Sequence, residues 1–313
     1  MHFVIMGGAG FIGSHVTEQL LAERHAVTVV DNLLTGNLHN LPCHPQLRFL
    51  QRDLFACQPH DFIKPIDGIV HLAATPSVTQ SWLNPLDVHR NNLSTTVALI
   101  QLCEALKISR LVFASSAAVY GANIQLPISE EQEANPISPY GLQKLVSEYY
   151  INLFARQFNL SCISLRLFNV FGPRQVPDSP YSGVISIFTQ AMRQGTPITI
   201  YGDGQQTRDF IYVKDVARAF VQALTVPLPA GSTLSCNVGT GQKTSLIKLI
   251  HILKDYFPNW KPNIQFANVR PGDIQHSQAN ISRIMALLEF TPRWSVQSGL
   301  RILAESIAHI VSY

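Results

Sequence analysis

The sequence predicts an α/β protein with a doubly wound parallel sheet and a smaller α/β region toward the C-terminus. Predicted strands and helices alternate from residue 2 to about 167, which is typical of a parallel sheet with helices on both faces. Beyond that point, prolines and glycines interrupt the alternation. The length suits roughly two domains. We therefore expect one domain over 1–167, with returning segments near 208–240, and a second over 168–207 and 241–313.

The individual elements are predicted from apolar runs that are bounded by turn residues. In the first domain we expect strands at 2–6, 26–30, 47–50, 68–72, 110–115 and 161–167. Helices are expected up to about residue 24, from 85 to about 107, and over 139–158. In the second part we expect helices at 184–194 and 245–256, a helix capped by Asp215, two C-terminal helices, and strands at 198–201, 208–213, 234–238 and 264–267.

A glycine-rich turn, Gly7-x-x-Gly10-x-x-Gly13, joins the first strand to the first helix. Glycines there permit a tight turn and a close approach of the backbone to a pyrophosphate at the helix N-terminus. Asp31 ends the next strand, where its carboxylate could accept hydrogen bonds from both ribose hydroxyls of an adenosine and would repel a 2′-phosphate. The pattern predicts a Rossmann-type sheet that binds NAD rather than NADP.

A second motif combines Ser116, just after a predicted strand, with Tyr140 and Lys144 on a predicted helix. Ser138 and Pro139 suit the start of that helix, and a spacing of four puts both later side chains on one face. An ammonium favours the ionised phenol. The three residues therefore predict general acid/base catalysis at an alcohol or ketone. The alternative is an ordinary amphipathic face with a lysine that reaches solvent.

Composition excludes several classes of function. The chain is 46% hydrophobic and 14% charged, which suits a large core, and a net charge of +3 without a run of Lys or Arg does not indicate a nucleic-acid partner. Five scattered cysteines lack metal-site spacing, so we expect reduced thiols and no metal. A strand at 2–6 leaves no room for a signal peptide, and no apolar run has membrane-spanning length. We expect a soluble cytoplasmic protein with no membrane association.

The motifs together resemble a known family. They are the glycine turn, Asp31, Ser116, Tyr140-x-x-x-Lys144 and Arg208-Asp209-Phe210. Over nearly the whole chain they resemble the extended short-chain dehydrogenase/reductases, and more narrowly the nucleotide-sugar epimerases of the UDP-glucose 4-epimerase type. The resemblance implies tightly held NAD, a UDP-sugar substrate and a homodimer built on helices around 92–107 and 140–158. Apolar residues of the second helix fit such a contact: Leu142, Leu145, Val146, Tyr149 and Leu153.

The expected cofactor site rests on the residue patterns described above and on the family resemblance. Asp53 could bind the adenine amino group or simply shape a turn, and small residues after the strand at 68–72 would let the cofactor lie against the strand end. One amide of Asn91-Asn92 could face the site. The candidate cofactor-binding residues are Gly7, Gly10, Phe11, Ile12, Gly13, Asp31, Asn32, Gly36, Asp53, Leu54, Leu72, Ala73, Ala74, Asn92, Ser115, Tyr140 and Lys144.

The resemblance also implies the chemistry. Related dehydratases place Asp-Glu where this chain has Ala117-Ala118, so elimination lacks its acid and base and oxidation with re-reduction at C4 remains. Tyr140 would act as base on the 4-hydroxyl and Ser116 would share that hydrogen bond. Lys144 would bind the nicotinamide ribose and depress the pKa of Tyr140. The candidate catalytic residues are thus Ser116, Tyr140 and Lys144.

The substrate residues are implied by the same resemblance. Arg208 and Arg270 would clamp phosphates, Asn169 would touch the diphosphate, and Asp273 would hold the uridine ribose. Ser277 falls where a bulky tyrosine excludes 2-acetamido sugars in related enzymes, which predicts UDP-GlcNAc and UDP-GalNAc as substrates, with UDP-Glc and UDP-Gal as further candidates; the alternative is an ordinary loop serine. The candidate substrate-binding residues are Ser116, Asn169, Gly183, Val184, Thr199, Tyr201, Arg208, Arg270, Asp273 and Ser277.

Three other functions remain open at this point. A UDP-glucuronate 4-epimerase would share the fold and the motifs. A nucleotide-sugar 4-keto reductase would normally prefer NADPH, which Asp31 disfavours. A non-enzymatic NAD-binding sensor or scaffold would typically lose the tyrosine or the lysine, and this chain keeps both Tyr140 and Lys144.

Overall fold

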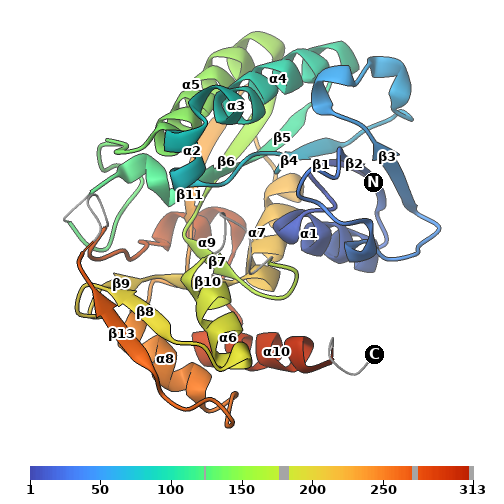
Figure 1. Ribbon diagram of the computed structural model, residues 1–313. Coiled ribbons are helices and arrows are strands. Elements are labelled where there is room, and N and C mark those ends of the chain that lie inside the picture. The colour runs from blue at the N-terminus through green and yellow to red at the C-terminus, as the bar shows by residue number, and fades with distance from the viewer. Residues whose placement is uncertain (123–124, 176–182, 270–273, 310–313) are drawn as a thin grey trace.

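The computed structural model describes residues 1–122, 125–175, 183–269 and 274–309. At its centre lies a sheet of seven strands in the order β11-β6-β5-β4-β1-β2-β3 (Figure 1). All neighbouring strands pair in parallel. The strands are β1 His2–Met6, β2 Ala26–Asp31, β3 Leu47–Gln51, β4 Gly68–His71, β5 Arg110–Ser116, β6 Ser161–Leu167 and β11 Thr233–Val238. The predicted doubly wound parallel sheet is confirmed.

The order of the strands determines where a ligand can bind. From β1 the chain proceeds outward through β2 and β3 and then returns to β4 on the other side of β1. Open α/β sheets bind ligands beyond the carboxyl ends of the strands at such a switch point. Both the glycine turn after β1 and Ser116 at the end of β5 lie at this edge.

Helices cover both faces of the sheet (Figure 1). One layer contains α1 Phe11–Ala22 and α7 Val213–Thr225; the other contains α4 Thr95–Leu106 and α5 Pro139–Phe158. Alternate residues of a strand point to opposite faces. Phe3 and Ile5 accordingly join the core under α1 and α7, while Val4 and Met6 join the core under α4 and α5.

The C-terminal part forms a separate α/β region with its own core, on one side of the large sheet (Figure 1). Three strand pairs build it: β7 Asn169–Phe171 with β10 Phe210–Tyr212, β8 Ile198–Tyr201 with β13 Ile264–Ala267, and β9 Thr207–Arg208 with β12 Thr244–Ser245. Its helices are α6 Val184–Gln194, α8 Leu246–Lys254 and α10 Val296–His309, whereas α9 Ser282–Leu288 packs near β11 and α7. The short helical turns are η1 Leu38–Asn40, η2 Leu54–Ala56, η3 Pro59–Asp61 and η5 Ala117–Tyr120.

The long helix predicted from 85 to 107 is interrupted. The chain forms α2 Val78–Leu83, α3 Pro85–His89 and a π-helical segment η4 Arg90–Ser94 before α4. In this segment the Thr95 hydroxyl donates to the Arg90 carbonyl over 2.7 Å, and the Thr96 hydroxyl donates to the Asn92 carbonyl over 2.8 Å. Such side-chain bonds compete with the regular helical ladder. Spacing of apolar residues does not reveal them.

Two further predictions are corrected at residues of the C-terminal half. The predicted strand 208–213 is divided at Asp209, because that side chain turns inward and accepts four hydrogen bonds from Thr240, Gly241 and Ala279. Asp215 does not cap α7, whose N-cap is Tyr212. The Asp215 carboxylate instead accepts from the backbone of Arg293 and Trp294.

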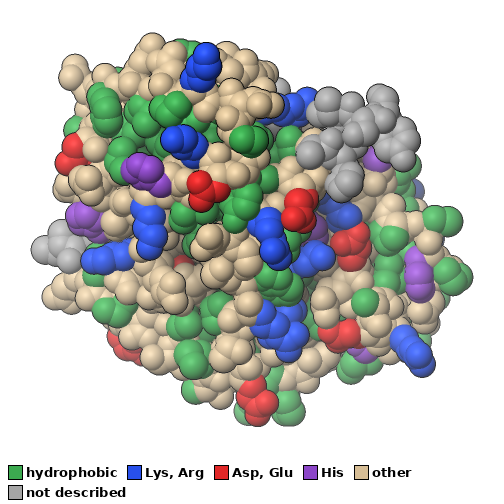
Figure 2. All heavy atoms as spheres, turned by 90° about the horizontal axis from the view of Figure 1, so that it is seen from below, with side chains coloured by type: hydrophobic (Ala, Val, Ile, Leu, Met, Phe, Trp, Pro, Cys, Tyr) green, Lys and Arg blue, Asp and Glu red, His purple; other side chains and the backbone are tan. Residues whose placement is uncertain are grey.

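Basic and acidic side chains are interspersed on the face seen from below (Figure 2). None of the helices in the described part of the chain combines the length and the hydrophobicity that crossing a bilayer requires. The described residues also contain no group of three or more His, Cys, Asp and Glu side chains arranged to hold a metal ion.

Candidate active site

The turn between β1 and α1 has room only for glycine at Gly7 and Gly13. Gly7 has φ +82°, and a Cβ atom there would lie 2.7 Å from the Ala73 backbone nitrogen. A Cβ on Gly13 would lie 2.1 Å from the Gly7 carbonyl oxygen. Gly10 is the N-cap of α1 and offers no side chain to the first amide groups of the helix. The turn is therefore a backbone cradle at a helix N-terminus, which suits a pyrophosphate.

Asp31 lies beside this cradle at the end of β2. One carboxylate oxygen accepts from the Ala9 backbone N–H over 3.0 Å and the other from the Leu33 N–H over 2.9 Å. A Cβ on Gly36 would come within 2.7 Å of the same carboxylate. The turn, Asp31 and the Gly36 loop thus converge, and together they fit the diphosphate and adenosine ribose of a dinucleotide.

Several other predicted cofactor residues are engaged with the protein itself. Asp53 caps η2 and accepts from the Asn32 amide over 3.0 Å, and Leu54 is buried. The Asn92 amide accepts from the Thr75 backbone N–H over 2.7 Å.

The remaining cofactor candidates lie at the start of α1 and at the ends of β4 and β5. Phe11 and Ile12 begin α1, and Leu72, Ala73 and Ala74 follow β4 directly. The Ser115 hydroxyl, at the end of β5, donates to Glu148.

The catalytic candidates come together at the carboxyl edge of the sheet. Ser138 caps α5 by accepting from the Gly141 N–H over 3.1 Å, so the helix begins one residue before Tyr140. The Ser116 hydroxyl accepts from the Ala118 N–H over 3.2 Å and lies near enough to Tyr140 to favour its ionised phenol. The Lys144 Nζ donates to the Ala114 carbonyl over 2.8 Å and lies 6.0 Å from the centroid of the Tyr140 ring.

The titration of these groups is governed by burial. Burial raises the pKa of Tyr140, because the phenolate is poorly solvated, and the Ser116 hydrogen bond offsets part of this rise. Burial also lowers the pKa of Lys144 to about 8, against an opposing effect of Glu148. Desolvation therefore decides the direction of the pKa of Tyr140 in the protein without its cofactor, and the lowering contribution expected of Lys144 stays a prediction. The cationic nicotinamide of bound NAD would favour the phenolate.

The described substrate candidates lie in the C-terminal region. Asn169 is exposed on β7, Gly183 and Val184 begin α6, and Thr199 and Tyr201 lie on β8. The Arg208 guanidinium donates to the carbonyls of Thr207 and Gln275. The backbone N–H of Ser277, a buried residue, donates to the Thr207 carbonyl over 3.0 Å, so Ser277 lies beside Arg208 in space. Arg270 and Asp273 lie outside the described residues.

Comparison with known proteins identifies the family. Residues 3–239 match the model of the NAD dependent epimerase/dehydratase family. The chain belongs to this family. The predicted NAD-dependent epimerase, its nucleotide-sugar chemistry and its NAD cofactor are confirmed.

Known proteins are similar to this chain over nearly its whole length. A UDP-glucose 4-epimerase of Mycolicibacterium smegmatis is 34% identical over 96% of both chains. A UDP-N-acetylglucosamine 4-epimerase from Methanobrevibacter ruminantium, solved with UDP-N-acetylmuramic acid, is 35% identical with a TM-score of 0.93 over 99% of both chains. A UDP-glucuronic acid 4-epimerase from Bacillus cereus, solved with UDP-glucuronic acid and NAD, is 30% identical with a TM-score of 0.90 over 99% of this chain and 100% of that chain.

This family member also contains a buried polar network that was not predicted. Glu148 on α5 forms an ion pair with Arg166 on β6, whose guanidinium also donates to the Tyr120 hydroxyl. Tyr120 in turn donates to Asn237 on β11 over 2.6 Å. One signal was visible in the sequence: Glu148 follows Tyr140 and Lys144 at intervals of four, so it shares their buried helix face.

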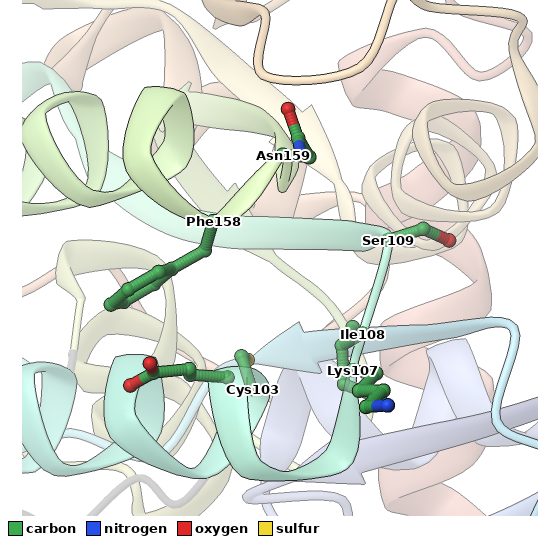
Figure 3. A pocket seen from close by; sticks show the side chains of 7 residues that line it. Cys103, Lys107, Ile108, Ser109, Phe158 and Asn159 are labelled. Carbon is green, nitrogen blue, oxygen red and sulfur yellow. The ribbon is translucent and has the colours of Figure 1, made fainter.

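A surface pocket of about 320 Å³ lies between the ends of α4 and α5 (Figure 3). Phe158 of α5 faces α4 and Cys103 across it, and Ile108 and Ser109 line its end. The last two residues precede β5, so the pocket lies at the amino edge of the sheet. Ligands of parallel sheets bind at the opposite edge, and this pocket takes no part in the site described above.

Proposed function

We propose that this protein is an NAD-dependent 4-epimerase of UDP-hexoses that interconverts UDP-GlcNAc and UDP-GalNAc, with UDP-Glc and UDP-Gal as further substrates. The observation that carries the proposal is the convergence of Ser116, Tyr140 and Lys144 at the carboxyl edge of the sheet, beside a glycine cradle that fits NAD. The adjoining turn η5 begins with Ala117 and Ala118, so neither residue offers a carboxylate for a dehydration.

The side chains divide the chemistry as follows. Tyr140 takes the proton of the 4-hydroxyl as general base, and the Ser116 hydroxyl hydrogen-bonds the same oxygen. Lys144 contributes a fixed cation that stabilises the phenolate. When bound, NAD supplies the acceptor and later the donor of the hydride at C4. Tyr140 returns the proton to the C4 oxygen once the hydrogen at C4 has been restored on the opposite face.

The proposed sugar preference depends on Ser277. This residue is small and buried and its backbone is fixed beside Arg208, the proposed phosphate ligand. A small side chain there leaves room for an N-acetyl group, and its hydroxyl can hydrogen-bond an amide. The 35% identity to an enzyme named UDP-N-acetylglucosamine 4-epimerase supports this choice.

Ser277→Tyr tests the assignment. We expect the variant to lose activity on the acetamido pair and to retain any activity on the plain hexose pair, because the ring would overlap the N-acetyl group in the rotated keto sugar. The measurement is kcat/KM for both pairs, and Ser277→Ala is the matched control that keeps the pocket open. Equal losses on both pairs, or an unchanged acetamido rate, would show that Ser277 does not set the size of the pocket.

UDP-glucuronate 4-epimerisation is the second candidate, supported by the similarity to the Bacillus cereus enzyme. A panel of UDP-hexoses, UDP-acetamidohexoses and UDP-glucuronate, with epimers separated by chromatography, distinguishes the two. Turnover that requires added NADPH would instead indicate a 4-keto reductase. Absence of turnover with every UDP-sugar, while NAD stays bound, would indicate a sensor or scaffold.

We also propose a homodimer as the working form. Large apolar side chains are exposed on α5 and on the neighbouring α2 and α3, among them Trp82, Leu86, Leu142, Tyr149 and Leu153. A contiguous exposed apolar face favours association. Two details differ from the expected face. Leu145 is buried inside the molecule, and α4 exposes Gln101, Glu104 and Ala105 rather than large apolar side chains.

A further inference from the structure

Glu148 lies on α5, the helix that carries Tyr140 and Lys144, and its side chain is buried, with 2% of the residue's surface exposed. One oxygen accepts from the Ser115 hydroxyl over 2.5 Å and from Arg166 Nε over 3.0 Å. The other accepts from Arg166 Nη2 over 2.8 Å and from the Ser235 hydroxyl over 3.3 Å. The bidentate bond to Arg166 ties α5 to β6, and the bonds from Ser115 and Ser235 tie it to the adjacent strands β5 and β11.

Glu148 and Lys144 hold consecutive residues of β5. Lys144, one helical turn earlier, donates to the Ala114 carbonyl over 2.8 Å, and Ser115 donates to Glu148. The next residue is Ser116, whose hydroxyl meets Tyr140. The two charged side chains of α5 therefore fix the end of the strand that presents the catalytic serine.

The groups around Lys144 determine how strongly Glu148 acts on the charge of its amine. Lys144 faces His71 from β4, the Phe113 ring at 4.8 Å from β5, and Tyr140 from its own helix. His71 carries no charge near neutral pH, since burial lowers its pKa to about 3. The Arg166 cation on β6 is neutralised by Glu148. Glu148 is thus the negative charge that favours the protonated amine on Lys144, whose pKa burial lowers to about 8.

We propose that Glu148, paired with Arg166, is a positioning residue for the epimerisation: it holds Ser115 at the end of β5 and keeps the Lys144 amine protonated at working pH. The proposal rests on the proposed function, because it assigns to Lys144 a cation that the reaction needs. It gives a reason for a buried ion pair that a purely structural role would not require, since such pairs contribute little net stability.

The pH profile of kcat for Glu148→Gln tests this role. With the carboxylate gone and Arg166 still charged, Lys144 loses its proton at lower pH. We expect the alkaline limb of the profile to move down by about one pH unit or more, with full NAD content. Arg166→Gln leaves the carboxylate uncompensated and should move the same limb upward, while the double variant should restore it toward the wild-type position.

Ser235→Ala is the matched control, because it removes one hydrogen bond to Glu148 without changing any charge. It should leave the alkaline limb in place. A rate that falls equally at all pH values in Glu148→Gln, with the limb unmoved, would overturn the proposal and leave the pair a structural role only. If Glu148→Gln does not fold, the opposite shift of Arg166→Gln decides, and an unmoved limb there overturns the proposal equally.

The titration can also be followed without turnover. In protein labelled with ¹³C-lysine, the signal that Lys144→Met removes belongs to Lys144, and its midpoint should shift in the same directions in the same variants. This readout separates the two proposals. If no UDP-sugar is epimerised but the Lys144 midpoint shifts as expected, the proposed function fails and the electrostatic role of Glu148 stands; an unmoved midpoint overturns that role.

Discussion

Gly13→Ala is a direct test of the cradle between β1 and α1. The new Cβ would lie 2.1 Å from the Gly7 carbonyl oxygen, 2.8 Å from the Gly8 Cα and 2.9 Å from the Gly7 carbonyl carbon, whereas real contacts of this kind stay above 3.0 Å. The start of α1 must therefore move away from the turn by nearly an ångström. All three opposing atoms belong to the backbone, so no side chain can rotate to relieve the overlap.

The cost follows from these distances. Overpacking in a dense interior typically lowers the free energy of unfolding by about 1–3 kcal/mol. Because the opposing atoms here are backbone atoms, we expect a loss near the upper end, about 3 kcal/mol. For a chain of this length that corresponds to a fall in Tm of roughly 5 °C. The displaced helix also moves its N-terminal amides, so we expect NAD to bind at least roughly tenfold more weakly.

Gly10→Ala is the control in the same turn. Its Cβ would meet only the Gly7 carbonyl oxygen, at 3.3 Å, so the Tm of the NAD-free protein should fall by less than about 1 °C. NAD affinity should still drop, because the methyl group would occupy the path of the pyrophosphate. Differential scanning calorimetry of the NAD-free proteins and calorimetric titration with NAD measure both quantities. An unchanged Tm in Gly13→Ala would refute the packing argument. Full NAD affinity in Gly10→Ala would refute the close approach of the pyrophosphate to the backbone at Gly10.

The remaining predictions concern catalysis and assembly. Tyr140→Phe should lower turnover by about 10²–10⁴-fold while NAD released on denaturation stays stoichiometric; Tyr149→Phe, which alters an exposed hydroxyl on the same helix, should be neutral, and near-normal turnover in Tyr140→Phe would show that another group is the base. Light scattering should give twice the chain mass of 34.7 kDa, and Leu153→Glu should reduce it to one chain, because a charge would be placed on the apolar face of α5; a monomeric wild-type protein would contradict the proposed dimer.

Local patterns in the sequence predicted much of the fold and part of the site. Strands and helices with a regular apolar period appear where expected, because such periods encode which face is buried. The glycine turn, Asp31 and the spacing of Tyr140 and Lys144 act over a few residues, so their arrangement is implied by a strand, a turn or one helical turn. The Ser138 cap of α5 is one such local interaction, and the structure shows it.

Only the tertiary structure decided the features that depend on distant partners. Glu148 contacts Ser115 across 33 residues of sequence, and Tyr120 contacts Asn237 across 117, so neither contact has a local signal. The π-helical turn before α4 depends on side-chain hydrogen bonds rather than on apolar spacing. The direction of the pKa of Tyr140 likewise follows from burial, which results from packing the whole chain, whereas a lysine four residues away suggested the opposite.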